Sequence, residues 1–63
     1  MKLYKYDGPV LDLYKDRTRC DRFVAYTHAS SVKDALQHFK RQYCKAHNLV
    51  SSAPVRLKED YIS

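Results

Sequence analysis

The sequence predicts an α+β domain in which a small antiparallel β-sheet packs on one amphipathic α-helix, in the order β-β-β-α-β. The chain of 63 residues has room for one domain with a thin core, and we take residues 1–63 as that single small domain. Hydrophobic residues make up 44% of the chain and charged residues 30%, which is typical of a folded protein and not of a disordered tail. The pattern of apolar residues is typical of β-strands in the first half of the chain and has the period of an α-helix in the second half.

The helix is the most clearly marked element, and we expect it from about Ser31 to His47. Apolar side chains recur there at steps of three and four and form one stripe that needs a partner to cover it. Ser31 and Asp34 match a capping pattern at the start, and Asn48 followed by Leu49 matches a Schellman-type end. The stripe consists of Val32, Ala35, Leu36, Phe39, Tyr43 and Ala46.

Three strands are expected before the helix. Residues 2–6 and 10–15 flank Asp7-Gly8-Pro9, which is a hairpin signal because glycine tolerates a positive φ and proline cannot continue a ladder. The third strand covers residues 22–28, after a polar loop over residues 16–21.

A break and a short strand are expected after the helix. Ser51-Ser52-Ala53-Pro54 interrupts the chain, and residues 55–58 alternate as a strand with Val55 and Leu57 inward. One helix covers only one face of such a sheet, so the outward strand residues determine what the open face offers.

The loop of the first hairpin decides which face the tyrosines occupy, and two loops remain open. With a three-residue loop over residues 7–9, Tyr4, Tyr6 and Tyr14 lie on the open face. With a four-residue loop over residues 7–10, Tyr4 and Tyr6 belong to the core. The sequence does not choose between them, because a slip of one residue turns every side chain to the other face.

Positive charge is concentrated in the second half of the chain. Twelve Lys and Arg against seven Asp and Glu leave a net charge of +5. From Lys33 to Lys58 there are six basic residues and one acid, Asp34, so this part carries the whole excess. Such a surface attracts polyanions, either nucleic acid or an acidic protein face, although charge also keeps a small domain in solution.

Two groups of cations are candidate nucleic-acid-binding residues, because Lys and Arg contact phosphates and Arg does so with two parallel hydrogen bonds. One group lies on the helix face opposite the stripe, with Lys40 at its border. The other lies on or beside the longest loop, where Asp16 and Asp21 partly neutralise it. Both groups are also explained as ordinary solvated surface. The candidates are Lys33, Lys40, Arg41 and Lys45 on the helix, and Arg17, Arg19 and Arg22 near the loop.

Aromatic residues offer a second kind of surface, since they form 13% of a chain that has no Trp. Interleaved with cations, they stack on bases or anchor a protein partner. Tyrosine is also a favoured strand residue whose hydroxyl reaches water from a thin core. The candidate protein-binding residues are Tyr4, Tyr6, Tyr14 and Tyr26.

The sequence predicts no catalytic residue, no metal site and no cofactor. Cys20 and Cys44 are too few for a disulfide scaffold, so free thiols are expected, and with the three histidines they lack the paired spacing of a zinc knuckle. No nucleophile elbow, phosphate-cradling glycine loop or paired carboxylate motif indicates an enzyme.

No apolar run reaches the roughly 18 residues of a membrane span, and no apolar leader follows Met1. We therefore expect a cytoplasmic protein without a membrane partner, and its oligomeric state is left open.

Lys5-Tyr6-Asp7-Gly8-Pro9-Val10, together with the basic amphipathic helix, resembles short uncharacterised proteins encoded by phages and integrative elements of Gram-positive bacteria. The resemblance implies a mobile-element accessory protein that acts on nucleic acid or on a host protein. Separately, three strands followed by a helix are similar in architecture to the DNA-binding arm domains of tyrosine integrases, which lay a sheet in the major groove. The first hypothesis is therefore nucleic-acid binding, and the alternative is a module that modulates a host protein through a tyrosine-rich sheet face.

Overall fold

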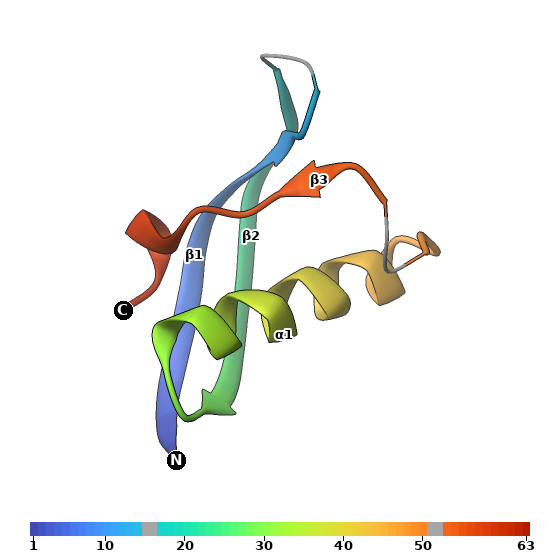
Figure 1. The fold of residues 1–63 in the computed structure, drawn as a ribbon. Coiled ribbons are helices and arrows are strands. Elements are labelled where there is room, and N and C mark those ends of the chain that lie inside the picture. The colour runs from blue at the N-terminus through green and yellow to red at the C-terminus, as the bar shows by residue number, and fades with distance from the viewer. Residues whose placement is uncertain (15–16, 51–52) are drawn as a thin grey trace.

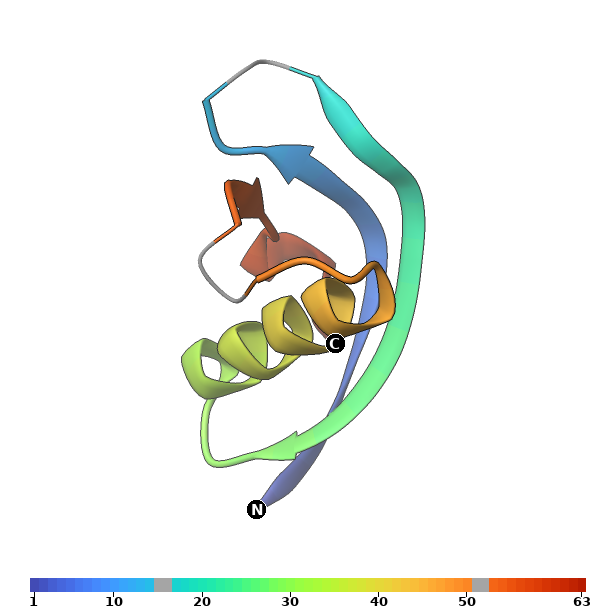
Figure 2. The same ribbon diagram turned by 90° about the vertical axis from the view of Figure 1, so that its right-hand side faces the viewer.

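The computed structural model describes residues 1–14, 17–50 and 53–63 and shows an α+β fold. Its elements are β1 (Lys2–Asp12), β2 (Thr18–Ala29), α1 (Val32–Ala46), β3 (Val55–Arg56) and the 3₁₀ turn η1 (Glu59–Tyr61). β1 is the central strand of a three-stranded antiparallel sheet of order β2-β1-β3 (Figure 1). The helix lies on the concave side of the curved ribbon formed by β1 and β2 (Figure 2). The predicted pairing of a small antiparallel sheet with one helix is confirmed.

The predicted order β-β-β-α-β is wrong, because no hairpin forms at Asp7-Gly8-Pro9. β1 continues through these residues, and the connection to β2 follows Asp12. Only two strands precede the helix in the described residues, so the order is β-β-α-β. The predicted third strand is the central part of β2, and residues 18–21, expected in a loop, belong to the same strand. The expectations placed on Lys15, Asp16, Ser51 and Ser52 lie outside the described residues.

Gly8 and Pro9 mark a close approach and a bulge instead of a turn. Gly8 does not adopt a positive φ; its missing side chain leaves room for the ring of Tyr61. A Cβ placed on Gly8 would lie 2.5 Å from Tyr61 Cδ1 and 2.8 Å from Tyr61 Cβ. Pro9 falls where the register with β2 shifts, between the pairs Gly8↔Phe23 and Val10↔Cys20. Its missing N–H is tolerated at this position because the ladder is interrupted there.

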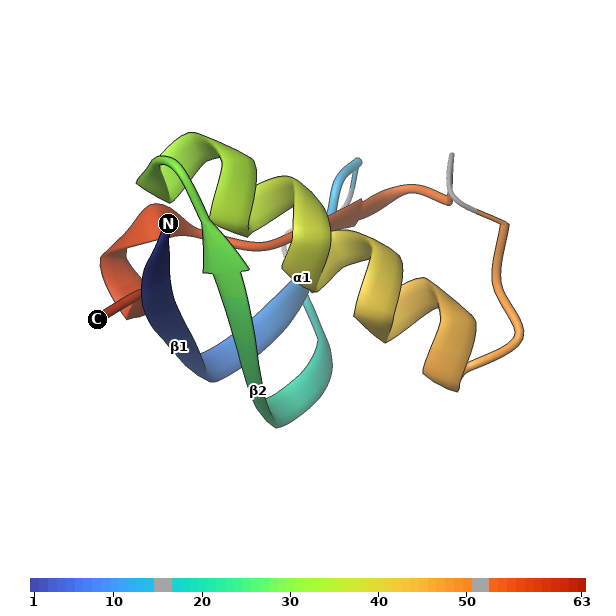
Figure 3. The ribbon, with the colours of Figure 1, turned by 90° about the horizontal axis from the view of Figure 1, so that it is seen from below.

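The register places Tyr4 and Tyr6 on the side of the helix. Both side chains are buried, together with Val10 on the same face of β1. Neither predicted hairpin loop exists, and the tyrosines are core residues because the alternation of β1 puts its large apolar side chains under α1. The helix lies over this face of both strands, as Figure 3 shows from below.

The helix begins and ends as predicted. Ser31 Oγ accepts a hydrogen bond from the Asp34 N–H at 3.2 Å. At the other end Asn48 has a φ of 56°, and the Leu49 N–H donates to the Cys44 carbonyl at 2.7 Å. The Asn48 N–H donates to the Lys45 carbonyl at 3.4 Å, which completes a Schellman motif.

The apolar stripe is confirmed in its central part. Ala35, Phe39 and Tyr43 are buried and Leu36 is half-buried, whereas Val32 and Ala46 are exposed because they lie at the two ends of α1. Cys44, outside the predicted stripe, is buried beside Tyr43 in the core.

The last part of the chain closes the second edge of β1. β3 pairs with Leu11 and Asp12, and Val55 and Leu57 are buried as predicted. Further along, Tyr6 forms a bridge with Ile62, and Lys5 and Ser63 exchange backbone hydrogen bonds of 3.0 and 2.9 Å. The final segment therefore runs beside β1, as the red ribbon of Figure 1 shows, and the outer edge of β2 is paired with no strand of the described residues.

Replacing Gly8 with Ala is expected to lower the free energy of unfolding by about 1–3 kcal/mol, because the added methyl group overlaps Tyr61. Urea denaturation followed by circular dichroism measures this loss. Val24→Ala, an exposed position of β2, serves as the control and should cost less. A Gly8→Ala variant as stable as the parent would show that Tyr61 does not occupy this position.

Candidate nucleic-acid interface

Three of the four predicted helix cations share the outer face of α1. Lys33, Arg41 and Lys45 are exposed; Arg41 follows Lys33 by eight residues and Lys45 follows Arg41 by four, which places them on one side of the helix. At a rise of 1.5 Å per residue, Lys33 and Arg41 are about 12 Å apart along the axis, and Lys45 follows about 6 Å further on. None of the three forms an ion pair within the part of the chain that the structure describes.

Lys40 connects this face to β3. It is half-buried, and together with Arg56 it lines a shallow groove of about 180 Å³ between α1 and β3. The apolar part of the groove comes from Leu36, Val55 and Leu57. The positive surface of the helix therefore extends over the groove to Arg56.

The predicted loop arginines are held by acidic residues. Arg17 Nε and Arg19 Nη1 lie 4.0 and 3.9 Å from Asp12 Oδ2, and the side chain of Asp12 is only 10% exposed. Arg22 forms two parallel hydrogen bonds with Asp7, of 2.7 and 2.9 Å. The sequence pointed to Asp16 and Asp21 as the neutralising acids, whereas the described partners are Asp12 and Asp7, which lie on the neighbouring strand.

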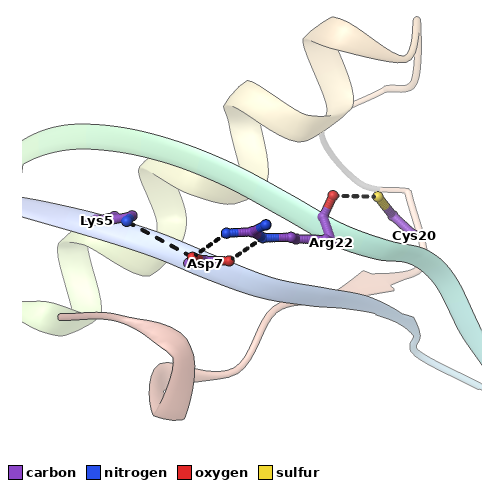
Figure 4. Close-up of polar contacts among 4 residues, drawn as sticks. All are labelled: Lys5, Asp7, Cys20 and Arg22. Atoms are coloured by element: carbon purple, nitrogen blue, oxygen red, sulfur yellow. Dashed lines mark hydrogen bonds and ion pairs between the residues drawn. The ribbon is translucent and has the colours of Figure 1, made fainter.

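Among the described residues, the shortest of the ion pairs joins Arg22 and Asp7 (Figure 4). The hydrogen bonds from Arg22 hold the pKa of the Asp7 carboxyl below its ordinary value of 3.8, and Lys5, 3.8 Å away, contributes in the same direction. Asp7 in turn raises the pKa of the Arg22 guanidinium. Arg22 is also held through its backbone, because Cys20 Sγ donates to the Arg22 carbonyl at 3.3 Å.

The sheet face opposite α1, which we call the open face, combines apolar and charged side chains. Leu3, Val24 and Tyr26 are exposed on it, and 57% of Tyr26 is accessible to solvent. Lys5 Nζ lies 5.9 Å from the centre of the Tyr26 ring, within the range of a cation–π contact. The open face consists of Leu3, Lys5 and Asp7 of β1 and Arg22, Val24, Tyr26 and His28 of β2.

The four predicted protein-binding tyrosines do not form one surface. Tyr4 and Tyr6 are buried under α1, so the prediction of a tyrosine-rich sheet face must be corrected. Tyr26 remains on the open face. Tyr14 is 81% exposed and lies elsewhere, after the end of β1.

The seven predicted cations are likewise divided among three places. Four lie on α1, Arg17 and Arg19 lie near the turn between β1 and β2, and Arg22 lies on the open face. Sequence reasoning missed Arg56 and Lys58 as site residues. The alternation of apolar and basic residues over residues 55–58 could have identified them, because inward Val55 and Leu57 place both cations on the outside.

His38 and His47 make contacts within the fold, whereas His28 is exposed on the open face. His38 Nδ1 lies 3.1 Å from Thr27 Oγ1, and the ring of His47 lies 4.3 Å from that of Tyr43. Cys20 and Cys44 are free, and no cluster of three potential metal ligands occurs among the described residues. Within the same ranges, no helix is both long and apolar enough to cross a membrane.

Comparison of the chain with protein-family models, with curated proteins and with solved structures finds no match.

Arg22→Gln is expected to raise the pKa of Asp7 towards 3.8, and Lys5→Gln should raise it less, because Lys5 makes only the longer contact. Carboxyl NMR titration of the parent and both variants measures this pKa. Since folding lowers it, the pair stabilises the fold above the unfolded pKa, and this contribution is lost as the pH falls through the folded value. Equal Asp7 pKa values in the parent and in Arg22→Gln would exclude the ion pair.

Proposed function

We propose that this protein binds nucleic acid through the outer face of α1, as a cytoplasmic accessory protein of a phage or mobile element. The main support for binding is that the helix cations and the strand and loop arginines differ in whether an acidic residue pairs with them. Lys33, Arg41 and Lys45 are exposed and have no acidic partner among the described residues, whereas Arg17, Arg19 and Arg22 are each engaged by Asp12 or Asp7. The link to a mobile element rests only on the resemblance at residues 5–10 and in the basic amphipathic helix.

Cations without acidic partners are the ones that a phosphate backbone uses best. Each phosphate contact releases condensed counterions, so the affinity falls steeply with salt. Contacts from the three exposed helix cations predict a loss of about 40-fold between 50 and 200 mM salt, and five contacts, with Lys40 and Arg56 included, predict about 500-fold. The proposal needs no metal, cofactor or catalytic residue.

The likeness to the integrase arm domains does not support this proposal. It rested on three strands before the helix, and the described chain has two. On the open face Arg22 and Lys5 are engaged by Asp7, and Leu3 and Val24 are exposed apolar side chains. The helix is therefore the better candidate for contact with nucleic acid.

The second candidate function is binding of a host protein through the open face. The exposure of Leu3, Val24 and Tyr26 favours it, because apolar and aromatic side chains are the usual anchors of protein interfaces. On this face the charge of Asp7 is already balanced by Arg22 and Lys5. Such an interface should respond little to salt, which separates the two candidates.

Arg41→Gln and Arg22→Gln each remove one positive charge, the first from the outer face of α1 and the second from the ion pair with Asp7. For a mixed-sequence duplex, Arg41→Gln should reduce the slope of log affinity against log salt by about 1, whereas Arg22→Gln should change it less. Fluorescence anisotropy over a salt series measures both slopes. Equal effects of the two variants would show that nonspecific charge governs binding, and no binding at about 50 mM salt would leave the open-face candidate.

A further inference from the structure

A second hollow lies between the end of β1, the start of β2 and β3, and we call it the junction hollow. Its volume is about 350 Å³. Here the end of β1 and the start of β2 bend towards the side of the β1–β2 ribbon on which α1 lies (Figure 2). The side chains that matter here are those of Leu11, Leu13, Tyr14, Arg17, Arg56 and Lys58.

The junction hollow has an excess of positive charge. Three cations line it, against the single carboxylate of Asp12. That carboxylate is shared by Arg17 and Arg19 at 4.0 and 3.9 Å and is largely buried, and Arg17 is mostly exposed. Arg56 and Lys58 form no ion pair within the described ranges, although Glu59 and Asp60 line the adjacent hollow with them. An anion in the hollow is therefore favoured electrostatically.

Tyr14 adds an aromatic surface to these cations. The Tyr14 N–H donates to Asp12 Oδ1 at 3.0 Å. Its side chain is 81% exposed, and within the described chain it makes no ring contact of the kind that holds Tyr6, Tyr43 and Tyr61. An exposed ring beside cations is the combination with which proteins stack the bases of a single strand and hold its backbone.

We propose that the junction hollow holds one nucleotide of a single-stranded nucleic acid, with its base stacked on Tyr14 and its phosphate in contact with Arg56 and Lys58. This inference rests on the proposed function and specifies the form of the ligand, since a base inside a duplex is already stacked on both faces. Arg56 lines both this hollow and the groove that contains Lys40. A strand held in the junction hollow therefore continues towards the cations of α1.

The test compares two DNA single strands of equal length, one with bases and one abasic, by fluorescence anisotropy at about 50 mM salt. Tyr14→Leu should lower the affinity for the base-bearing strand about tenfold and that for the abasic strand less than about twofold. Arg56→Gln should lower the affinity for both strands. Tyr26→Leu, a matched control on the open face, should leave both affinities unchanged. Circular dichroism of each variant confirms that the fold is retained.

The outcomes separate this inference from the proposed function. If Arg41→Gln weakens binding of both strands and Tyr14→Leu changes neither, the junction hollow is not the nucleotide site and the helix proposal stands. Equal losses for the two strands in Tyr14→Leu would also overturn base stacking. If the parent protein binds neither the single strands nor the duplex at low salt, both proposals fail.

Discussion

The packing of one side chain, Tyr6, connects four parts of the chain. Its ring is fully buried in β1 and lies 5.6 Å from Phe39 of α1, 6.0 Å from Phe23 of β2 and 6.1 Å from Tyr61 of η1, between ring centres. Its hydroxyl donates to the Pro9 carbonyl at 2.7 Å and accepts the Lys58 N–H at 3.2 Å. Burial raises the pKa of this phenol above its ordinary value of 10.0, which widens the pH range over which the hydroxyl donates to Pro9. In a domain of 63 residues, whose core is thin, such a contact has a large share in the fold.

The position of Tyr6 also explains how the cations are distributed. Because Phe39 packs on it, the opposite side of α1, with Lys33 and Arg41, faces solvent. Because the Lys58 N–H is bound to its hydroxyl, the chain from β3 onwards runs along β1 and places Arg56 near the hairpin end. The cations of β2 stand beside β1 and meet its acids. The cations of α1 and β3 form no ion pair with an acidic residue in the part of the chain that the structure describes, so they are available to bind a polyanion.

The sequence predicted the parts of this structure that local signals determine. The helix has a period, a serine cap and an Asn48 end that act within a few residues, so its boundaries could be read directly. Gly8 and Pro9 led to the wrong prediction of a hairpin. Gly8 is explained by its close approach to Tyr61, and Pro9 by a register shift between β1 and β2, and both involve residues far away in the sequence. The same holds for the candidate site. Charge counting located the basic half, but only the fold shows which arginines have acidic partners and that Tyr4 and Tyr6 are core residues.

The most direct test of this account is amide hydrogen exchange of Tyr6→Phe, which keeps the ring and removes the hydroxyl. The variant leaves the Lys58 N–H and the Pro9 carbonyl without this partner, at a cost of about 1–3 kcal/mol. We expect exchange to accelerate by at least about fivefold at Lys58, Ile62 and Ser63, while the central amides of α1 keep more of their protection. Unchanged protection of these three amides, or an equal loss in α1, would contradict the claim that the Tyr6 hydroxyl holds the final segment in place.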